Sequence, residues 1–181
     1  FLGPPVDFRL KTMMDEKKLL HINPRRFAQG LSAALCHCHT RKILLGKQAL
    51  SISSIYLTAK GGEFTPVIVD LSGATHVSLT DIKNELKLES KRKHDDHADL
   101  KTLADSQKAD SRMKQSDLMH MPIEQMLGSR VSTMPCDVWR AGMLCIQVSM
   151  GKPIVSGHNR LEFIKNISKS MGTKYWPTLK R

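Results

Sequence analysis

The sequence predicts one domain, mainly α-helical, with a single small β-hairpin. Four stretches predict helices: three carry apolar residues at the three- and four-residue spacing that gives a helix one buried face, and one is almost continuously apolar. Between the second and the third lie two short runs of β-forming residues around a Gly-Gly pair, a pattern typical of a hairpin. The chain has 181 residues, of which 40% are apolar and 25% charged, so it is long enough for one domain with its own core.

Two helices are predicted at the N-terminal end. The first covers residues 7–20, and the second runs from Pro24 to about Thr40. Asn23 directly precedes Pro24, so the second helix has a capping side chain and a proline suited to its first turn.

The predicted hairpin and the last two helices follow. Its strands are Ser54–Thr58 and Pro66–Leu71, joined by a turn that contains the Gly-Gly pair. Residues 138–150 form a nearly continuous apolar run, which predicts a buried helix. Residues 161–171 are amphipathic and end before Gly172, a good helix terminator.

A polar insert at about 78–119 separates the hairpin from these last helices. Its central part, Lys83–Asp117, is either a solvated helix or a disordered segment. Residues 80–117 contain nine basic and nine acidic residues, so the net charge of +11 belongs to the remainder of the chain. A basic balance suits an acidic partner such as nucleic acid or an acidic protein face. A membrane partner is not expected, because no apolar run approaches the roughly 18–20 residues of a membrane span.

Cysteine and histidine residues do not predict a metal site. The four cysteines lie in apolar segments and are expected to be buried free thiols of a reducing, intracellular compartment: Cys36, Cys38, Cys136 and Cys145. Neighbours on a helix point about 100° apart, so the run Cys36–His39 cannot converge on one ion. The run His94–His97 lies in the polar insert and is better interpreted as a solvated face. The chain has two Trp and two Tyr, too few for a platform on which nucleic-acid bases could stack. A role in contacting the phosphate backbone of a nucleic acid stays open.

Several motifs resemble the C-terminal lobe of protein kinases, in the order found there. Ser132–Gly142 is similar to S-T-x-x-D-x-W-S-x-G at the start of the central buried helix. Gly151–Gly157 resembles G-x-P-L-F-P-G, and Leu161–Pro177 resembles the L-x-x-I-x-x-x-L-G-T-P…W-P segment of cyclin-dependent kinases. Pro122–Glu124 stands where A-P-E would stand, and Val67–Ala74 resembles K-I-x-D-F-G-L-A. The closest resemblance is to the CMGC group, which contains the cyclin-dependent kinases.

The resemblance implies that residues 1–181 are one partial kinase-like C-lobe, with the insert at 78–119 in the activation-segment position. Neither a Gly-rich phosphate loop nor a V-A-I-K strand lysine occurs, so the N-lobe is expected to be missing. The sequence stops soon after the helix predicted at 161–171, so the last helices of the C-lobe are expected to be missing as well. The structural motif residues of the family fall on Glu124, Asp137, Trp139 and Gly142. Asp137 would anchor the backbone of the catalytic loop, and Glu124 would pair with an arginine from the missing part.

The catalytic loop of the family, H-R-D-x-K-x-x-N, has no working counterpart. Two alignments of this loop are open. In one register Leu45-Gly46-Lys47 stands at H-R-D and Ile52 at the Asn. In the other register Lys47-Gln48-Ala49 stands at H-R-D and Ser54 at the Asn. A kinase needs the Asp to orient and deprotonate the substrate hydroxyl, and the Asn to hold a metal ion. No Asp or Glu occurs between Arg41 and Gly62, so neither register supplies the base.

Asp70 stands at the remaining metal-ligand position, where it is expected to be vestigial. One carboxylate does not make the kinase metal site, so binding of ATP and Mg²⁺ is not expected. Its alternative role is hydrogen bonding at the end of a strand. These observations predict an inactive pseudokinase that binds other proteins as a scaffold or regulator, with Lys83–Asp117 as a docking segment. Two alternatives stay open: a structural subunit of a large assembly such as a ribonucleoprotein, and a fragment of a divergent Ser/Thr protein kinase.

Overall fold

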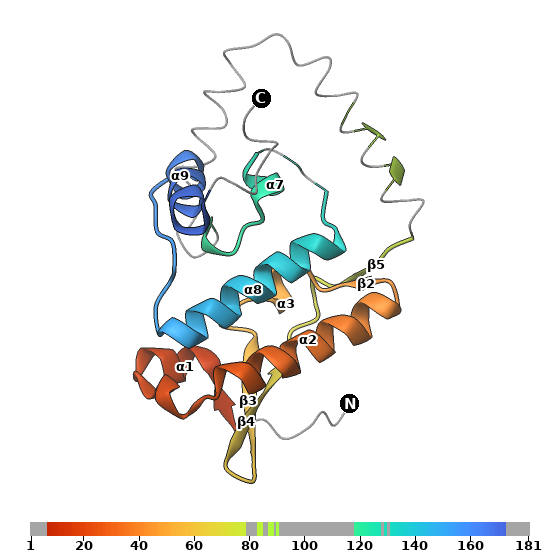
Figure 1. Cartoon of the computed structure of the whole chain (residues 1–181). Helices are drawn as coiled ribbons and strands as arrows, with labels where there is room; N and C mark the ends of the chain where they lie inside the picture. The colour runs from red at the N-terminus through yellow and green to blue at the C-terminus, as the bar shows by residue number, and fades with distance from the viewer. Residues whose placement is uncertain are drawn as a thin grey trace.

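The computed structural model describes residues 7–78, 83–84, 87–88, 90, 118–127, 129 and 131–172. It is mainly helical with a small antiparallel sheet, as the sequence predicts (Figure 1). In chain order its elements are β1 (Phe8–Arg9), α1 (Leu10–Asp15), the 3-10 helix η1 (Lys18–His21), α2 (Pro24–Thr40), β2 (Ile43–Leu44), α3 (Gly46–Ala49), β3 (Ile55–Lys60), β4 (Glu63–Ile68), β5 (Thr75–His76), α7 (Ile123–Met126), α8 (Met134–Met150) and α9 (Arg160–Met171).

The two 17-residue helices α2 and α8 pack together and form the larger core. In Figure 1 they lie side by side, with α3 behind α8. Burial of their apolar faces removes side-chain surface from water, which is the main stabilising term of such a core. The buried residues that α2 and α8 contribute are Phe27, Leu31, Leu35, Ala141, Leu144 and Val148.

Local signals fix the ends of the longer helices. Asn23 Oδ1 accepts hydrogen bonds from the backbone N–H groups of Arg25 and Arg26, at 3.0 and 3.2 Å, and so caps α2. The α9 helix starts in the same way, because Asn159 Oδ1 accepts from the N–H of Glu162 at 2.9 Å. The α8 helix ends at Gly151, whose φ of +67° is a left-handed conformation that glycine adopts without strain.

The predicted hairpin is present as β3 and β4, paired from Ile55 opposite Ile68 to Lys60 opposite Glu63. Both strands are shifted from the predicted bounds, since β3 continues to Lys60 and β4 ends at Ile68. The α2 helix packs on β4 so closely that a Cβ at Gly30 would lie 2.8 Å from Pro66 Cδ.

The prediction of one helix over 7–20 is wrong in its bounds. Phe8 and Arg9 are extended and pair with Leu57 and Tyr56 of β3, so they form the third strand of the sheet. The helical turn that follows stops before Lys17, which has a left-handed φ of +56°. Amphipathic spacing was sufficient to suggest a helix, but it could not reveal that a distant strand pairs with its first two residues.

A smaller second core lies where α7 and α9 meet the segment before α7. Its buried members are Leu118, Met119, Met126, Val155, Phe163 and Ile167. The short elements β2, α3, β5 and α7 were not predicted, because segments of two to four residues carry too little periodicity.

Most of the polar insert at 78–119 lies outside the described residues, and so do the run His94–His97 and most of the expected docking segment Lys83–Asp117. Among the helices of the described part, none combines the length and apolarity that crossing a membrane would need.

Candidate functional site

A buried carboxylate at the start of α8 holds the chain that leads into α3. The side chain of Asp137 is 1% exposed. Its Oδ2 accepts a hydrogen bond from the backbone N–H of Leu45 at 2.8 Å, and its Oδ1 accepts from the N–H of Gly46 at 3.0 Å. Both groups lie at the N-terminal end of α3, where backbone N–H groups have no partner within the helix. One side chain therefore satisfies two backbone donors that are remote in sequence.

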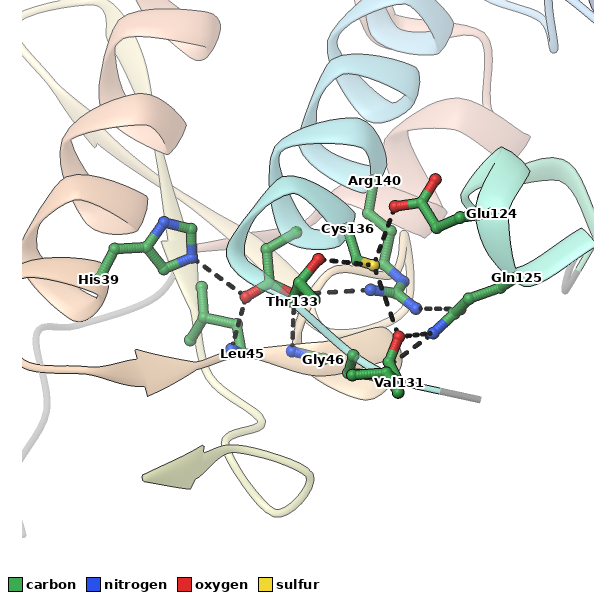
Figure 2. Close-up of polar contacts among 11 residues, drawn as sticks. His39, Leu45, Gly46, Glu124, Gln125, Val131, Thr133, Cys136 and Arg140 are labelled. Atoms are coloured by element: carbon green, nitrogen blue, oxygen red, sulfur yellow. Dashed lines mark hydrogen bonds and ion pairs between the residues drawn. The ribbon is translucent and has the colours of Figure 1, made fainter. Parts of the chain in front are cut away.

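Two basic side chains, His39 and Arg140, lie beside the Asp137 carboxylate, and both are labelled in Figure 2. His39 Nε2, from the last turn of α2, lies 3.1 Å from Asp137 Oδ2. Arg140 Nη1 lies 3.5 Å from Asp137 Oδ1, an ion-pair contact too long for a good hydrogen bond. Burial lowers the pKa of Arg140, while the nearby side chains of Cys136, Asp137 and Glu124 oppose that shift. Asp137 thus joins α2, α8 and the loop before α3.

A second polar cluster links α7 to the first turns of α8. Arg140 Nη2 donates a hydrogen bond to Gln125 Oε1 at 2.8 Å, and the Cys136 thiol donates to Glu124 Oε1 at 3.2 Å. The resemblance implied that Glu124 pairs with an arginine from a later part of the kinase lobe. Here a neighbouring thiol contacts the carboxylate, and the arginine of this cluster bonds to the next residue, Gln125.

The chain at Gly46 has a conformation that favours glycine. Its φ is +74°, and a Cβ there would lie 3.2 Å from the carbonyl oxygen of Gly73. A Cβ at Gly73 would in turn lie 2.6 Å from Gln48 Oε1. The turn that contains Gly73 therefore packs tightly against α3, and this brings the Asp70 region beside the loop held by Asp137.

Asp70 follows β4 and forms a local turn on the surface. Its Oδ1 accepts hydrogen bonds from the N–H of Ser72 at 3.0 Å and from the Ser72 hydroxyl at 2.6 Å. These two bonds lower the pKa of the Asp70 carboxyl below its usual value, with the hydroxyl as the larger cause. The same hydroxyl lies 3.3 Å from Gln48 Oε1 of α3. The carboxylate thus forms hydrogen bonds just after the end of β4, which is the role expected as the alternative to metal binding.

Replacing Ser72 by alanine is expected to raise the pKa of Asp70, because the hydroxyl bond favours the ionised carboxyl. A lowered folded-state pKa contributes stability above the unfolded pKa, and that contribution is lost as the pH falls through the folded value. At pH values above the unfolded pKa, the variant should therefore lack the part of this stability that the hydroxyl bond supplies. Carboxyl ¹³C shifts of Asp70 followed over an acid titration measure the effect. An unchanged midpoint in Ser72→Ala would show that the hydroxyl bond does not stabilise the carboxylate.

The other predicted positions differ in their burial and contacts. Ala49 is fully buried, Ile52 is partly buried between the two cores, and Ser54 is buried with its hydroxyl 3.0 Å from that of Ser51. Trp139 packs on the second core, and its buried indole Nε1 has no hydrogen-bond partner in the described part of the chain. Gly142 lies on the exposed side of α8, and a Cβ there would meet open space.

The four thiols are free, but the expectation that all are buried is wrong for Cys36, which is exposed on α2. Cys136 is buried, and Cys38 and Cys145 are half-buried. Burial is the main cause that raises the pKa of each of these three thiols. The residues that the structure describes contain no group of three or more His, Cys, Asp or Glu side chains arranged to hold a metal ion.

Sequence reasoning placed Asp137 at this site but missed His39 and Gln125. His39 was considered only as part of the run Cys36–His39, and its partner is 98 positions away in the sequence. No local spacing could have found that pair. Comparisons with protein-family models and with curated proteins find no match for the chain.

Proposed function

We propose that the chain is a catalytically inactive, protein-kinase-like module that binds other proteins as a scaffold or regulator. One observation carries the proposal: the buried Asp137 carboxylate accepts hydrogen bonds from the backbone of Leu45 and Gly46. The kinase resemblance assigns this task to the Asp of its central helix, namely to hold the catalytic loop from below. The loop that Asp137 holds in this chain, residues 45–54, contains no acidic residue.

The position of the anchor favours one of the two registers. Leu45 and Gly46 are the first two residues of the register that places Lys47 at the catalytic Asp. In the other register the motif would begin only at Lys47, after the anchored residues. Lys47 is exposed, and its positively charged ammonium group would repel Mg²⁺ and has no lone pair to accept a proton from a substrate hydroxyl.

The surroundings of Asp70 support the same conclusion. The turn that contains Asp70 packs against α3 through Ser72 and Gln48. It therefore lies next to the loop that Asp137 holds, and the kinase resemblance expects these two segments to be neighbours. The carboxylate is exposed and bonded to its own turn. Kinases hold two ions with an Asp and an Asn acting together. The candidates here for the second ligand are Ile52, which has no ligating atom in its side chain, and Ser54, whose hydroxyl is a weak ligand for Mg²⁺.

The catalytic half of the proposal is tested by incubating the chain with γ-labelled ATP, Mg²⁺ or Mn²⁺, and generic protein substrates. We expect incorporation no higher than in a blank without the chain, because the loop provides no base. Titration of Mg-ATP by calorimetry should give no heat of binding at concentrations up to about 1 mM, a Kd at which binding free energy would be only about −4 kcal/mol. Asp70→Asn is the matched variant. Label transfer that Asp70→Asn abolishes would show an active enzyme and contradict the proposal.

A further inference from the structure

Two hollows on the surface share one wall, the side chain of Met14 on α1. The first has a volume of about 340 Å³ and lies between α1, the segment from Lys47 to Ser53 and the start of the second core. The second, of about 440 Å³, lies between α1, the start of α2 and the C-terminal end of α8. Because both hollows are lined by Met14, we treat them as one surface and call it the α1 groove.

The floor of the α1 groove is apolar. Beside the shared Met14, it is lined by apolar side chains that belong to the two cores or pack against them, among them Leu50, Ile52, Met119, Leu19, Ile22 and Val148. In the first hollow the buried pair His120 and Gln147, whose Nε2 and Oε1 are 3.0 Å apart, closes the base. A largely preformed apolar floor with a few polar groups is typical of a binding site.

The rim of the α1 groove is predominantly basic. Lys11 and Lys47 line the first hollow and Lys17 lines the second, and all three side chains are exposed. The carboxylate of Asp15 is the acidic group among the lining residues. The hydroxyls of Ser51 and Ser53 add hydrogen-bond donors to the first hollow. Lysines around an apolar floor complement a ligand that offers carboxylates next to apolar side chains.

We propose that the α1 groove docks an acidic segment of a partner protein, in which Asp or Glu residues stand beside large apolar residues. The carboxylates contact Lys11 and Lys47, and the apolar side chains fill the hollows on either side of Met14. This inference rests on the proposed protein-binding function and specifies the chemistry of its partner. Charge complementarity selects the acidic segment, and the apolar floor selects a protein over a nucleic acid, whose phosphates would leave that floor uncovered.

The test uses the full chain and a fluorescein-labelled synthetic peptide composed of aspartate and leucine, with anisotropy as the readout. Two further peptides replace every aspartate by asparagine or by lysine. We expect the aspartate peptide to bind at least about threefold more tightly than the asparagine peptide, since two or three exposed charge contacts with the rim lysines are lost. The lysine peptide should not bind. Equal binding of the aspartate and asparagine peptides would overturn the inference.

Charge reversal locates the site. Lys47→Glu and Lys11→Glu are each expected to weaken binding of the aspartate peptide by about threefold to tenfold. The matched control is Lys165→Glu, an exposed lysine on α9 outside both hollows, which should leave the affinity unchanged. Lys11 and Lys47 lie on different elements, so a folding defect in one variant still leaves the other informative, with thermal melts as the check. Equal weakening by all three variants would indicate attraction to net charge alone and contradict the α1 groove.

Nucleic acid is the competing occupant. Oligouridylate should not displace the aspartate peptide, and its own binding should not depend on Lys11. Displacement that is lost in Lys11→Glu would assign the groove to nucleic acid and overturn the inference. A failed peptide test combined with a blank phosphate-transfer assay removes only the α1 groove and leaves the inactive module standing. Transfer of label from ATP that Asp70→Asn abolishes would instead remove the proposed function, whatever the peptide does.

Discussion

Asp137→Ala is expected to lower the free energy of unfolding by about 3–5 kcal/mol, the usual loss when one partner of a buried charged network is removed. The change leaves the N–H groups of Leu45 and Gly46 without an acceptor and leaves the buried Arg140 without its carboxylate. Urea unfolding followed by circular dichroism measures the difference, provided that the slope of the transition is unchanged.

Two variants make this result specific. Asp137→Asn keeps the shape and one acceptor oxygen, so its loss should be smaller than that of Asp137→Ala. Asp15→Ala removes an exposed carboxylate at the end of α1 and should change the stability by no more than about 0.5 kcal/mol. A loss below about 1 kcal/mol in Asp137→Ala would mean that water or another group replaces the carboxylate, and would contradict the anchoring role.

Phe27→Ala is the second change with a large expected effect, about 3–5 kcal/mol. The Phe27 ring is fully buried in the larger core on α2. Its removal loses both the transfer free energy of the ring and the packing around the cavity that remains. Denaturant or thermal unfolding gives the value.

Phe8→Ala is the matched control for this truncation. Phe8 is 46% exposed and contacts Phe64 edge to face, with ring centroids 5.5 Å apart. Losing that contact should cost about 1 kcal/mol. If the two truncations were equally costly, the core built by α2 and α8 would not dominate the stability of the chain.

The sequence predicted the long elements well because their signals are local. Asn23 and Asn159 cap the helices that follow them, and Gly151 and Gly172 stand just after the ends of α8 and α9. The N-terminal helix was predicted too long, because the pairing of Phe8 with Leu57 depends on a strand that lies 49 residues further along the chain. Such pairing leaves no trace in the spacing of nearby apolar residues.

The candidate site was predictable in its central residue and not in its surroundings. The motif around Asp137 indicated an anchoring carboxylate, and Asp137 accepts hydrogen bonds from the backbone of Leu45 and Gly46. The contacts of His39 and Gln125 arise only from packing between elements distant in the sequence. The α1 groove has the same origin, because Lys11 and Lys47 become neighbours of one hollow only after folding.

Hydrogen exchange at the backbone amides of Leu45 and Gly46 tests most directly whether the buried Asp137 carboxylate holds the chain that leads into α3. The reference is the amide of Gly61, in the turn between β3 and β4, where a Cβ would meet nothing and the residue is exposed. We expect the Leu45 and Gly46 amides to exchange at least about a hundredfold more slowly than that of Gly61, because opening them requires breaking buried bonds worth a few kcal/mol. Exchange of both amides at the rate of Gly61 would contradict the anchor.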